Sequence, residues 1–176
     1  TGGASGLGEA TARELARLGA KVAVLDRNQA LAEKVAAEIN GVACACDITD
    51  TDSVNAALDK AAAAHGPARI LMNVAGIGSA KRIVGKDGNP APLEDFVRVV
   101  QINLIGSYNV SRLFAARCAR LDATEGGDKG VMVFTASAAA FDGQVGQQAY
   151  SASKGGLVGM TLPMARDLAQ HGIRVC

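Results

Sequence analysis

The sequence of 176 residues has no surplus of charge of either sign. Its 18 Lys and Arg are balanced by 17 Asp and Glu, which gives a net charge of +1. This balance excludes a strongly basic nucleic-acid binder and an acidic tail protein. The sequence also lacks the run of about 18 apolar residues that a membrane-spanning helix requires. We therefore expect neither a nucleic acid nor a membrane among its partners.

Cysteine is scarce, and its spacing fits no metal or disulfide motif. The four cysteines are Cys44, Cys46, Cys118 and Cys176, and no two of them form a C-x-x-C pair. We therefore expect no metal site and no disulfide framework. Buried, reduced thiols indicate a reducing compartment. We expect the cytoplasm, with the mitochondrial matrix as the alternative, because the sequence does not begin with Met and a targeting segment can precede it.

Proline is also rare, and glycine is abundant without a repeat. Four Pro stand against 21 Gly, and 49% of the residues are hydrophobic. These values exclude collagen-like and disordered chains and allow a sizeable core. At this length we expect one domain, a dinucleotide-binding and catalytic unit over residues 1–176.

Short apolar runs alternate with helical patterns along the whole chain. The runs predict strands at 21–25, 42–46, 70–74, 131–135 and 173–176, and the helical patterns cover 7–18, 29–39, 51–65, 93–120 and 149–170. Polar stretches at 79–92 and 121–130 predict loops. This order is typical of an α/β fold, a doubly wound parallel sheet of the Rossmann type. Glycines 19, 41, 66 and 172 follow four of the helices, where a left-handed residue is expected.

The sheet is expected to be incomplete at both ends. No strand precedes the glycine-rich turn that opens the sequence, although a doubly wound sheet has a central strand there. The sequence also stops just inside a strand, at Cys176. We therefore expect a fragment without its first strand and its C-terminal segment, and we expect activity to belong to a longer parent chain.

The opening residues, TGGASGLG, predict a binding site for phosphates. Gly2, Gly6 and Gly8 directly precede a helical pattern, and glycine lets the backbone turn tightly and approach a pyrophosphate. The N-terminus of the helix then offers unpaired N–H groups and a partial positive charge. The spacing G-x-x-x-G-x-G is neither the G-x-G-x-x-G motif nor a P-loop, so the turn alone is weak evidence for a nucleotide.

Acidic and small residues end the next strands, at the edge where open α/β sheets bind ligands. Asp26 lies 18 residues after Gly8 and can accept hydrogen bonds from both hydroxyls of an adenosine ribose, which favours NAD over NADP. Arg27 beside it weakens that preference, and a helix N-cap is the alternative role for Asp26. Asp47 can bond an adenine amino group, and a cap or a turn is its alternative role. The following strand ends in Asn73, Val74, Ala75 and Gly76, which leave room for the adenine ribose.

Tyr150 and Lys154 are four residues apart in a helical pattern, so we expect both side chains on one face of the helix. The Lys154 ammonium would stabilise the ionised phenolate, so that Tyr150 can exchange a proton with a substrate hydroxyl or carbonyl. Ser137, 13 residues earlier, can hydrogen-bond the same substrate oxygen. Asn103 lies in the long helical pattern, where its amide can hold a water that connects to Lys154.

Together these motifs resemble the short-chain dehydrogenase/reductase family. The likeness covers TGGASGLG, Asp26, Asp47, NVAG, Asn103, Ser137 and YSASK, in order and spacing, with Val74 as a departure from the family's N-N-A-G. It implies NAD(P)-dependent oxidoreduction. The implied catalytic set is Asn103, Ser137, Tyr150 and Lys154, of which Tyr150 and Lys154 also meet the cofactor. Further implied cofactor contacts are Ser5, Leu7, Asp26, Asp47, Ile48 and Val74.

A closer likeness is to one subgroup, the type 2 3-hydroxyacyl-CoA dehydrogenases, whose relatives also oxidise some hydroxysteroids and alcohols. It is carried by LEDFVRVVQINLIGSYNVSRLF, FDGQVGQQAYSASKGG and GMTLPMARDLA. It implies an acyl-CoA-like substrate that meets Ser137, Gln144, Gln147 and Tyr150, although surface hydrogen bonding is the alternative for the two glutamines. It also implies a homodimer or homotetramer formed through 93–120 and 149–170. The alternatives are an NADPH-dependent 3-ketoacyl reductase acting on acyl carrier protein, and a non-catalytic dinucleotide-binding module or inactive fragment.

Overall fold

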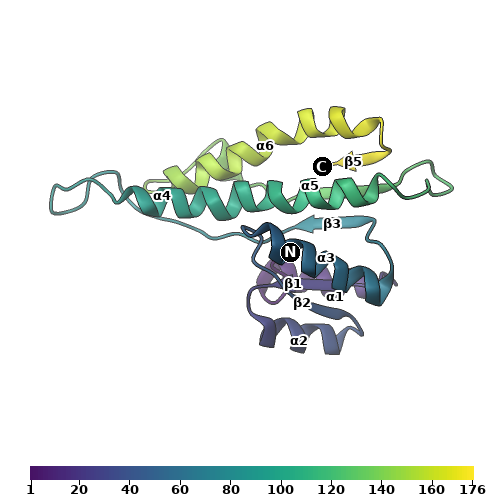
Figure 1. Cartoon of the computed structure of the whole chain (residues 1–176). Coiled ribbons are helices and arrows are strands. Elements are labelled where there is room, and N and C mark those ends of the chain that lie inside the picture. The colour runs from purple at the N-terminus through teal and green to yellow at the C-terminus, as the bar shows by residue number, and fades with distance from the viewer.

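Helices and strands alternate along the chain, as predicted, and the computed structural model describes all 176 residues (Figure 1). The strands are β1 (Ala23–Asp26), β2 (Val42–Ala45), β3 (Ile70–Asn73), β4 (Gly130–Phe134) and β5 (Ile173–Val175). The α-helices are α1 (Gly6–Arg17), α2 (Gln29–Glu38), α3 (Thr51–His65), α4 (Leu93–Val100), α5 (Ser107–Cys118) and α6 (Gln148–Ala169). All pairs of neighbouring strands are parallel, which confirms the predicted fold class.

The sheet is divided into two parts, β1–β2 and β3–β4–β5. The first residues of the chain bridge the facing edges of β1 and β3. The Thr1 ammonium donates to the Met72 carbonyl at 2.8 Å, and the Gly3 amide donates to the Leu25 carbonyl at 3.3 Å. An apolar cavity of about 320 Å³ lies between the same two edges. β1 and β3 are therefore not paired directly, and the sheet has a gap between them.

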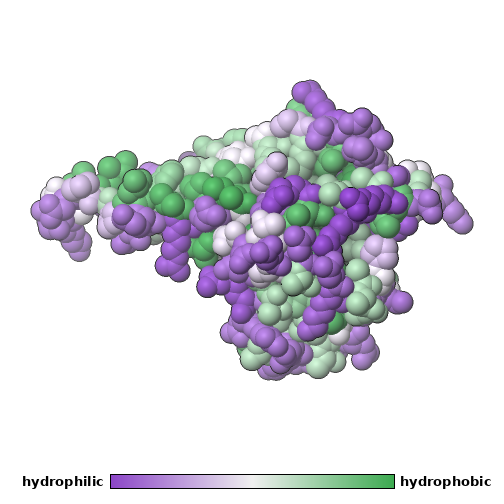
Figure 2. Space-filling model, in the orientation of Figure 1, coloured by the Kyte–Doolittle hydropathy of each residue, from purple (hydrophilic) through white to green (hydrophobic).

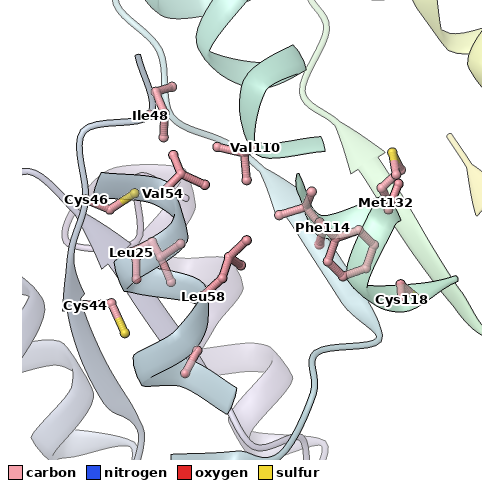
Figure 3. Packing of buried hydrophobic residues seen from close by; sticks show 14 of the residues in the cluster. Leu25, Cys44, Cys46, Ile48, Val54, Leu58, Val110, Phe114, Cys118 and Met132 are labelled. Atoms are coloured by element: carbon pink, nitrogen blue, oxygen red, sulfur yellow. The ribbon is translucent and has the colours of Figure 1, made fainter. Parts of the chain in front are cut away.

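The helices pack against the strands through two hydrophobic clusters. The larger cluster packs α3 and α5 against the strands, and Val54, Phe114 and Met132 are all at most 2% exposed in it (Figure 3). The smaller cluster joins α1 and α2 to β1 around Val24 and Ala32. Leu25 belongs to the larger cluster and Val24 to the smaller one, so the two clusters cover opposite faces of β1.

The long helix predicted over 93–120 is divided into three parts. A π-helical segment, Gln101–Gly106, separates α4 from α5. The Asn103 side chain is engaged in tertiary hydrogen bonds within this segment. At its end, a Cβ atom on Gly106 would lie 2.7 Å from a side-chain carbon of Ile48, so a larger residue there would displace the Ile48 side chain. π-helical turns of this kind are frequent at functional sites.

Two local predictions are corrected by the structure. Gly19, Gly66 and Gly172 have positive φ angles as expected, but after α2 the left-handed residue is Asn40, with φ 51°, and not Gly41. Asparagine tolerates this conformation, so the turn closes one residue earlier. All four cysteines are free and three are buried, whereas Cys176 is exposed because it follows the end of β5. None of the helices combines the length and the apolar character needed to cross a membrane.

Candidate active site

Two adjoining hollows lie at the carboxyl ends of the strands, with volumes of about 450 and 550 Å³. Leu7, Val74, Gly76 and Ile77 line both of them, so they form one continuous cleft. The first, the cofactor hollow, is lined among others by Gly2, Ser5, Gly6, Leu7, Gly8, Asp26, Asp47, Ile48, Val74, Ala75 and Gly76. The second, the substrate hollow, is lined among others by Ser137, Gln144, Gln147, Tyr150 and Lys154. Most of the residues singled out in the sequence therefore meet in one cleft.

The glycine-rich turn leaves the N-terminus of α1 open to a ligand. Ser5 precedes the helix in an extended conformation and makes no side-chain cap bond, so the first N–H groups of α1 have no protein partner within the helix. Gly2 and Gly6 have φ angles of 66° and 52°. A Cβ atom on Gly8 would lie 2.0 Å from the Gly2 carbonyl oxygen. The turn can take this shape only with glycine, and it suits an anionic group such as a pyrophosphate.

Asp26 ties the glycine-rich turn to the end of β1. One carboxylate oxygen accepts from the Ala4 amide at 3.1 Å and the other from the Asn28 amide at 2.9 Å, and each oxygen keeps a lone pair for a ligand. The N-cap of α2 is Asn28, whose side chain accepts from the Leu31 amide. The alternative role of Asp26 as that cap is therefore wrong. Asp26 instead lies in the wall of the cofactor hollow.

Asp47 lies at the end of β2, opposite Arg27. Its carboxylate accepts from the hydroxyl and the amide of Thr49 at 2.7 and 2.9 Å. These two hydrogen bonds, with Arg27 as a weaker influence, lower the pKa of Asp47 from its ordinary value. The Arg27 guanidinium is 3.5 Å from the same carboxylate, so its charge is partly directed to Asp47.

Asn73 is the one predicted cofactor residue whose side chain lines neither hollow. It is 3% exposed, and its amide donates to the Ser111 hydroxyl on α5 at 3.1 Å. Side chains alternate along a strand, so Asn73 points to the helix that covers the sheet. Its backbone carbonyl accepts from the Thr135 amide. Asn73 therefore supports the strand end, and the small residues that follow it line the cleft.

Tyr150 and Lys154 lie on the same face of α6, as their spacing predicts. The Lys154 ammonium is 5.7 Å from the centre of the Tyr150 ring and donates to the Thr135 carbonyl. Lys154 is only 5% exposed, and this burial lowers its pKa. The Ser137 hydroxyl accepts from the Ala139 amide at 3.2 Å, which leaves its own hydrogen free to donate into the hollow. A phenol, a hydroxyl and a buried cation can together bind a substrate oxygen and move its proton.

Asn103 lies behind the cleft, and its amide is fully used as a donor. Its oxygen accepts from the Ile77 amide at 2.8 Å, and its nitrogen donates to the Ile77 carbonyl at 2.9 Å and to the Ser153 hydroxyl at 3.0 Å. The Ser153 hydroxyl donates in turn to the Tyr150 carbonyl at 2.7 Å. Neither N–H is free for a water, whereas the side-chain oxygen keeps one lone pair, so the water that connects Asn103 to Lys154 stays a prediction. Asn103 braces the loop after β3 against the turn that carries Tyr150.

Three residues that sequence reasoning did not single out belong to the site. Thr135 supplies the carbonyl that holds Lys154, and Ser153 connects Asn103 to Tyr150. Ser153 could have been found, because it follows Tyr150 at the i, i+3 spacing in the same helical pattern. Asp142 lines the substrate hollow and is the one acidic residue between Ser137 and Tyr150. The backbone carbonyl of Thr135 has no signature in the sequence.

Comparison with known proteins gives consistent matches over the whole chain. A family model described as short chain dehydrogenase matches residues 1–176. The chain is 49% identical to the 3-hydroxyacyl-CoA dehydrogenase type-2 of Bos taurus, over 99% of this chain and 68% of the bovine protein. The crystal structure of 3-hydroxyacyl-CoA dehydrogenase type-2 from Mycobacterium avium matches with a TM-score of 0.93 at 41% identity, over 99% of this chain and 69% of that one. The crystal structure of a 3-ketoacyl-(acyl-carrier-protein) reductase from Brucella melitensis, complexed with NADH, matches with a TM-score of 0.86 at 33% identity. This match covers 99% of this chain and 70% of the reductase chain.

Gly8→Ala is expected to weaken binding of a dinucleotide by about tenfold or more, because overpacking of this size costs about 1–3 kcal/mol. The new methyl group would collide with the Gly2 carbonyl and displace the glycine-rich turn. Titration of NADH fluorescence measures the dissociation constant. The control is Gly159→Ala on α6, where a Cβ atom meets nothing within 4 Å. An unchanged constant in a folded Gly8→Ala protein would contradict the role of the turn.

Proposed function

Because the chain belongs to the short-chain dehydrogenase family, whose model spans all of its residues, we propose that it transfers a hydride between NAD and a 3-hydroxyacyl-CoA. The observation that carries this proposal is the meeting of Ser137, Tyr150 and Lys154 in one hollow that continues into the hollow of the glycine-rich turn. Enzymes of this family are NAD(P)-dependent oxidoreductases. The similarity to dehydrogenases named for 3-hydroxyacyl-CoA supports the substrate class.

In the proposed reaction Tyr150, as phenolate, takes the proton of the substrate hydroxyl. The Ser137 hydroxyl, whose hydrogen is not used elsewhere, donates to the same oxygen and fixes its position. The buried Lys154 ammonium stabilises the phenolate. When bound, NAD supplies the hydride acceptor at C4 of its nicotinamide. Asn103 contributes by holding Ile77 and, through Ser153, the backbone of Tyr150. In the reverse direction Tyr150 returns the proton to a 3-ketoacyl thioester.

We propose that NAD binds in the cofactor hollow. The open N-terminus of α1 would bind the pyrophosphate, and Asp26 would accept from both hydroxyls of the adenosine ribose. Asp47 and Ile48 would line the adenine, and Lys154 would hold the nicotinamide ribose. The negative charge of Asp26 would repel the 2′-phosphate of NADP, and Arg27 is partly directed to Asp47. We therefore propose NAD as the preferred cofactor.

The acyl part of the substrate is proposed to lie along the loop between β4 and α6. Gln144 and Gln147 line the substrate hollow, and the Gln147 side-chain oxygen accepts from the Gln144 amide at 2.9 Å. This bond leaves the Gln147 amide nitrogen free to donate to a thioester carbonyl. We propose the cytoplasm or the mitochondrial matrix as the compartment, since both keep free thiols reduced.

We propose a homodimer, or a homotetramer built from it, that covers an apolar surface on α4. Leu93, Phe96 and Val97 are 70%, 41% and 51% exposed there. Figure 2 shows hydrophobic residues gathered over the region of α4, and the surface around them is more polar. Monomeric proteins rarely leave contiguous apolar patches uncovered, so this surface suits a second copy of the chain.

The protein is expected to form NADH from NAD and 3-hydroxybutyryl-CoA, and Tyr150→Phe is expected to reduce kcat by about 10²- to 10⁴-fold because proton transfer is lost. Absorbance at the NADH maximum measures turnover, and fluorescence titration measures NADH binding, which should stay near wild type. Tyr108→Phe on α5 is the control. Turnover by Tyr150→Phe at the wild-type rate would refute the assignment. Activity with NADPH and an acyl carrier protein substrate alone would favour the reductase alternative, and bound NAD without turnover would favour the binding module.

Asp26→Asn is expected to shift cofactor preference toward NADP. The change removes the negative charge that faces the ribose and keeps the size of the side chain, so the ratio of NADP to NAD affinity should rise by about tenfold. Dissociation constants of both cofactors measure this ratio. Asp167→Asn, an exposed position near the end of α6, gives the same change in net charge outside the cleft. An equal ratio in both variants would exclude Asp26 as the selecting residue.

Leu93→Asp combined with Phe96→Asp is expected to convert the oligomer into a smaller species, because two charges would be buried at the proposed contact. Light scattering coupled to size exclusion measures the mass. Leu18→Asp, at a position 66% exposed at the end of α1, is the matched control. The same mass in all three proteins would show that α4 is not the contact surface.

A further inference from the structure

The substrate hollow is lined by two charged residues of opposite sign, and only the negative one is exposed. Asp142 and Lys154 are the two charged residues in its lining. Lys154 is 5% exposed, and its ammonium donates to the Thr135 carbonyl at the floor of the hollow. Asp142 is exposed, and none of the seven ion pairs of the structure involves it. A ligand in this hollow therefore meets a carboxylate with no cation to offset it on the exposed wall.

The backbone around Asp142 is held firmly. The amides of Phe141 and Asp142 both donate to the Ala138 carbonyl, at 3.0 and 2.9 Å. The next residue passes so close to α6 that a Cβ atom on Gly143 would lie 2.1 Å from the Ser151 hydroxyl oxygen. The backbone of Asp142 is therefore held in place. Only rotation of its short side chain can change the distance between the carboxylate and a bound substrate.

The rest of this wall carries no charge. Gln144 and Gln147 present amide groups to the hollow, and Phe141 and Val145 beside them are 82% and 73% exposed. The loop after Ser79 brings Lys81 next to Gly146, but the Lys81 ammonium is 2.6 Å from the Asp95 carboxylate. Neutral amides, apolar surface and one carboxylate suit an uncharged acyl group.

We infer that Asp142 makes the cleft select uncharged acyl substrates and disfavour alcohols or ketones that carry a free carboxylate near the reacting carbon. The inference rests on the proposed function and adds a reason why a thioester or ester of a hydroxy acid is accepted and the free acid is not. Two negative charges in a partly solvated cleft repel one another over a distance of several ångströms. The phosphates of CoA lie beyond its pantetheine arm, more than a Debye length of about 8 Å from the reacting carbon.

The test compares a neutral and an anionic ketone of nearly equal size, methyl acetoacetate and acetoacetate. Reduction by the purified protein with NADH gives kcat/KM for each, and quenching of bound NADH gives their dissociation constants without turnover. In wild type we expect the ester to be favoured. In Asp142→Asn we expect the preference for the ester to fall by about fivefold to tenfold, because the repulsion is removed. Asp142→Glu should keep the wild-type preference, since it keeps the charge.

Two controls isolate the charge in the wall. Asp167→Asn makes the same change in net charge outside the cleft and should keep the wild-type ratio. Raising the salt concentration from about 0.05 to 0.5 M should shrink the preference in wild type and leave it unchanged in Asp142→Asn, because salt screens exposed charges. A ratio that is the same in wild type and Asp142→Asn, by turnover or by binding, would overturn the inference. Failure of the proposed function would be recognised by a different result, the absence of NADH formation from 3-hydroxybutyryl-CoA.

Discussion

The cleft depends on a pair of hydrogen bonds between the side chain of Asn103 and the backbone of Ile77. Ile77 lines both hollows, so the position of its backbone sets how they meet. The same amide reaches Ser153, which is bonded to the turn of Tyr150. One buried side chain, 1% exposed, thus connects the loop after β3, the π-helical segment and α6. Buried polar networks whose members are all satisfied give a region a single arrangement, and this network lies directly behind the proposed chemistry.

The π-helical segment is the local change that makes this network possible. In a regular α-helix through 93–120 the Asn103 side chain would point in a different direction. The wider π-helical segment Gln101–Gly106 lets it face Ile77. The segment also brings the Gly106 backbone against Ile48, next to Asp47. A distortion in one helix therefore reaches both the loop at Asp47 and, through Asn103, the turn that carries Tyr150.

The sequence predicted features that follow from local spacing. Apolar runs located the five strands within two residues, and the separation of Tyr150 and Lys154 was enough to put them on one face of α6. The π-helical segment was not predictable, because the apolar periodicity continues through it and the deciding bonds come from Ile77, which is distant in the sequence. For the same reason the direction of the Asn73 side chain and the capping role of Asn28 became clear only in three dimensions. The chemical roles of the site residues remain predictions.

The placement of the cleft residues along the chain has a consequence for how such a protein can change. The residues proposed to choose between NAD and NADP lie after β1 and β2, whereas those proposed to handle the substrate lie between β4 and the middle of α6. The first group therefore lies in the part of the chain before β3, and the second lies in the part after β4. Mutations that exchange one cofactor for the other can therefore accumulate in the first part while selection on the second keeps the substrate constant. Cofactor preference and substrate range can therefore change independently of one another within one chain.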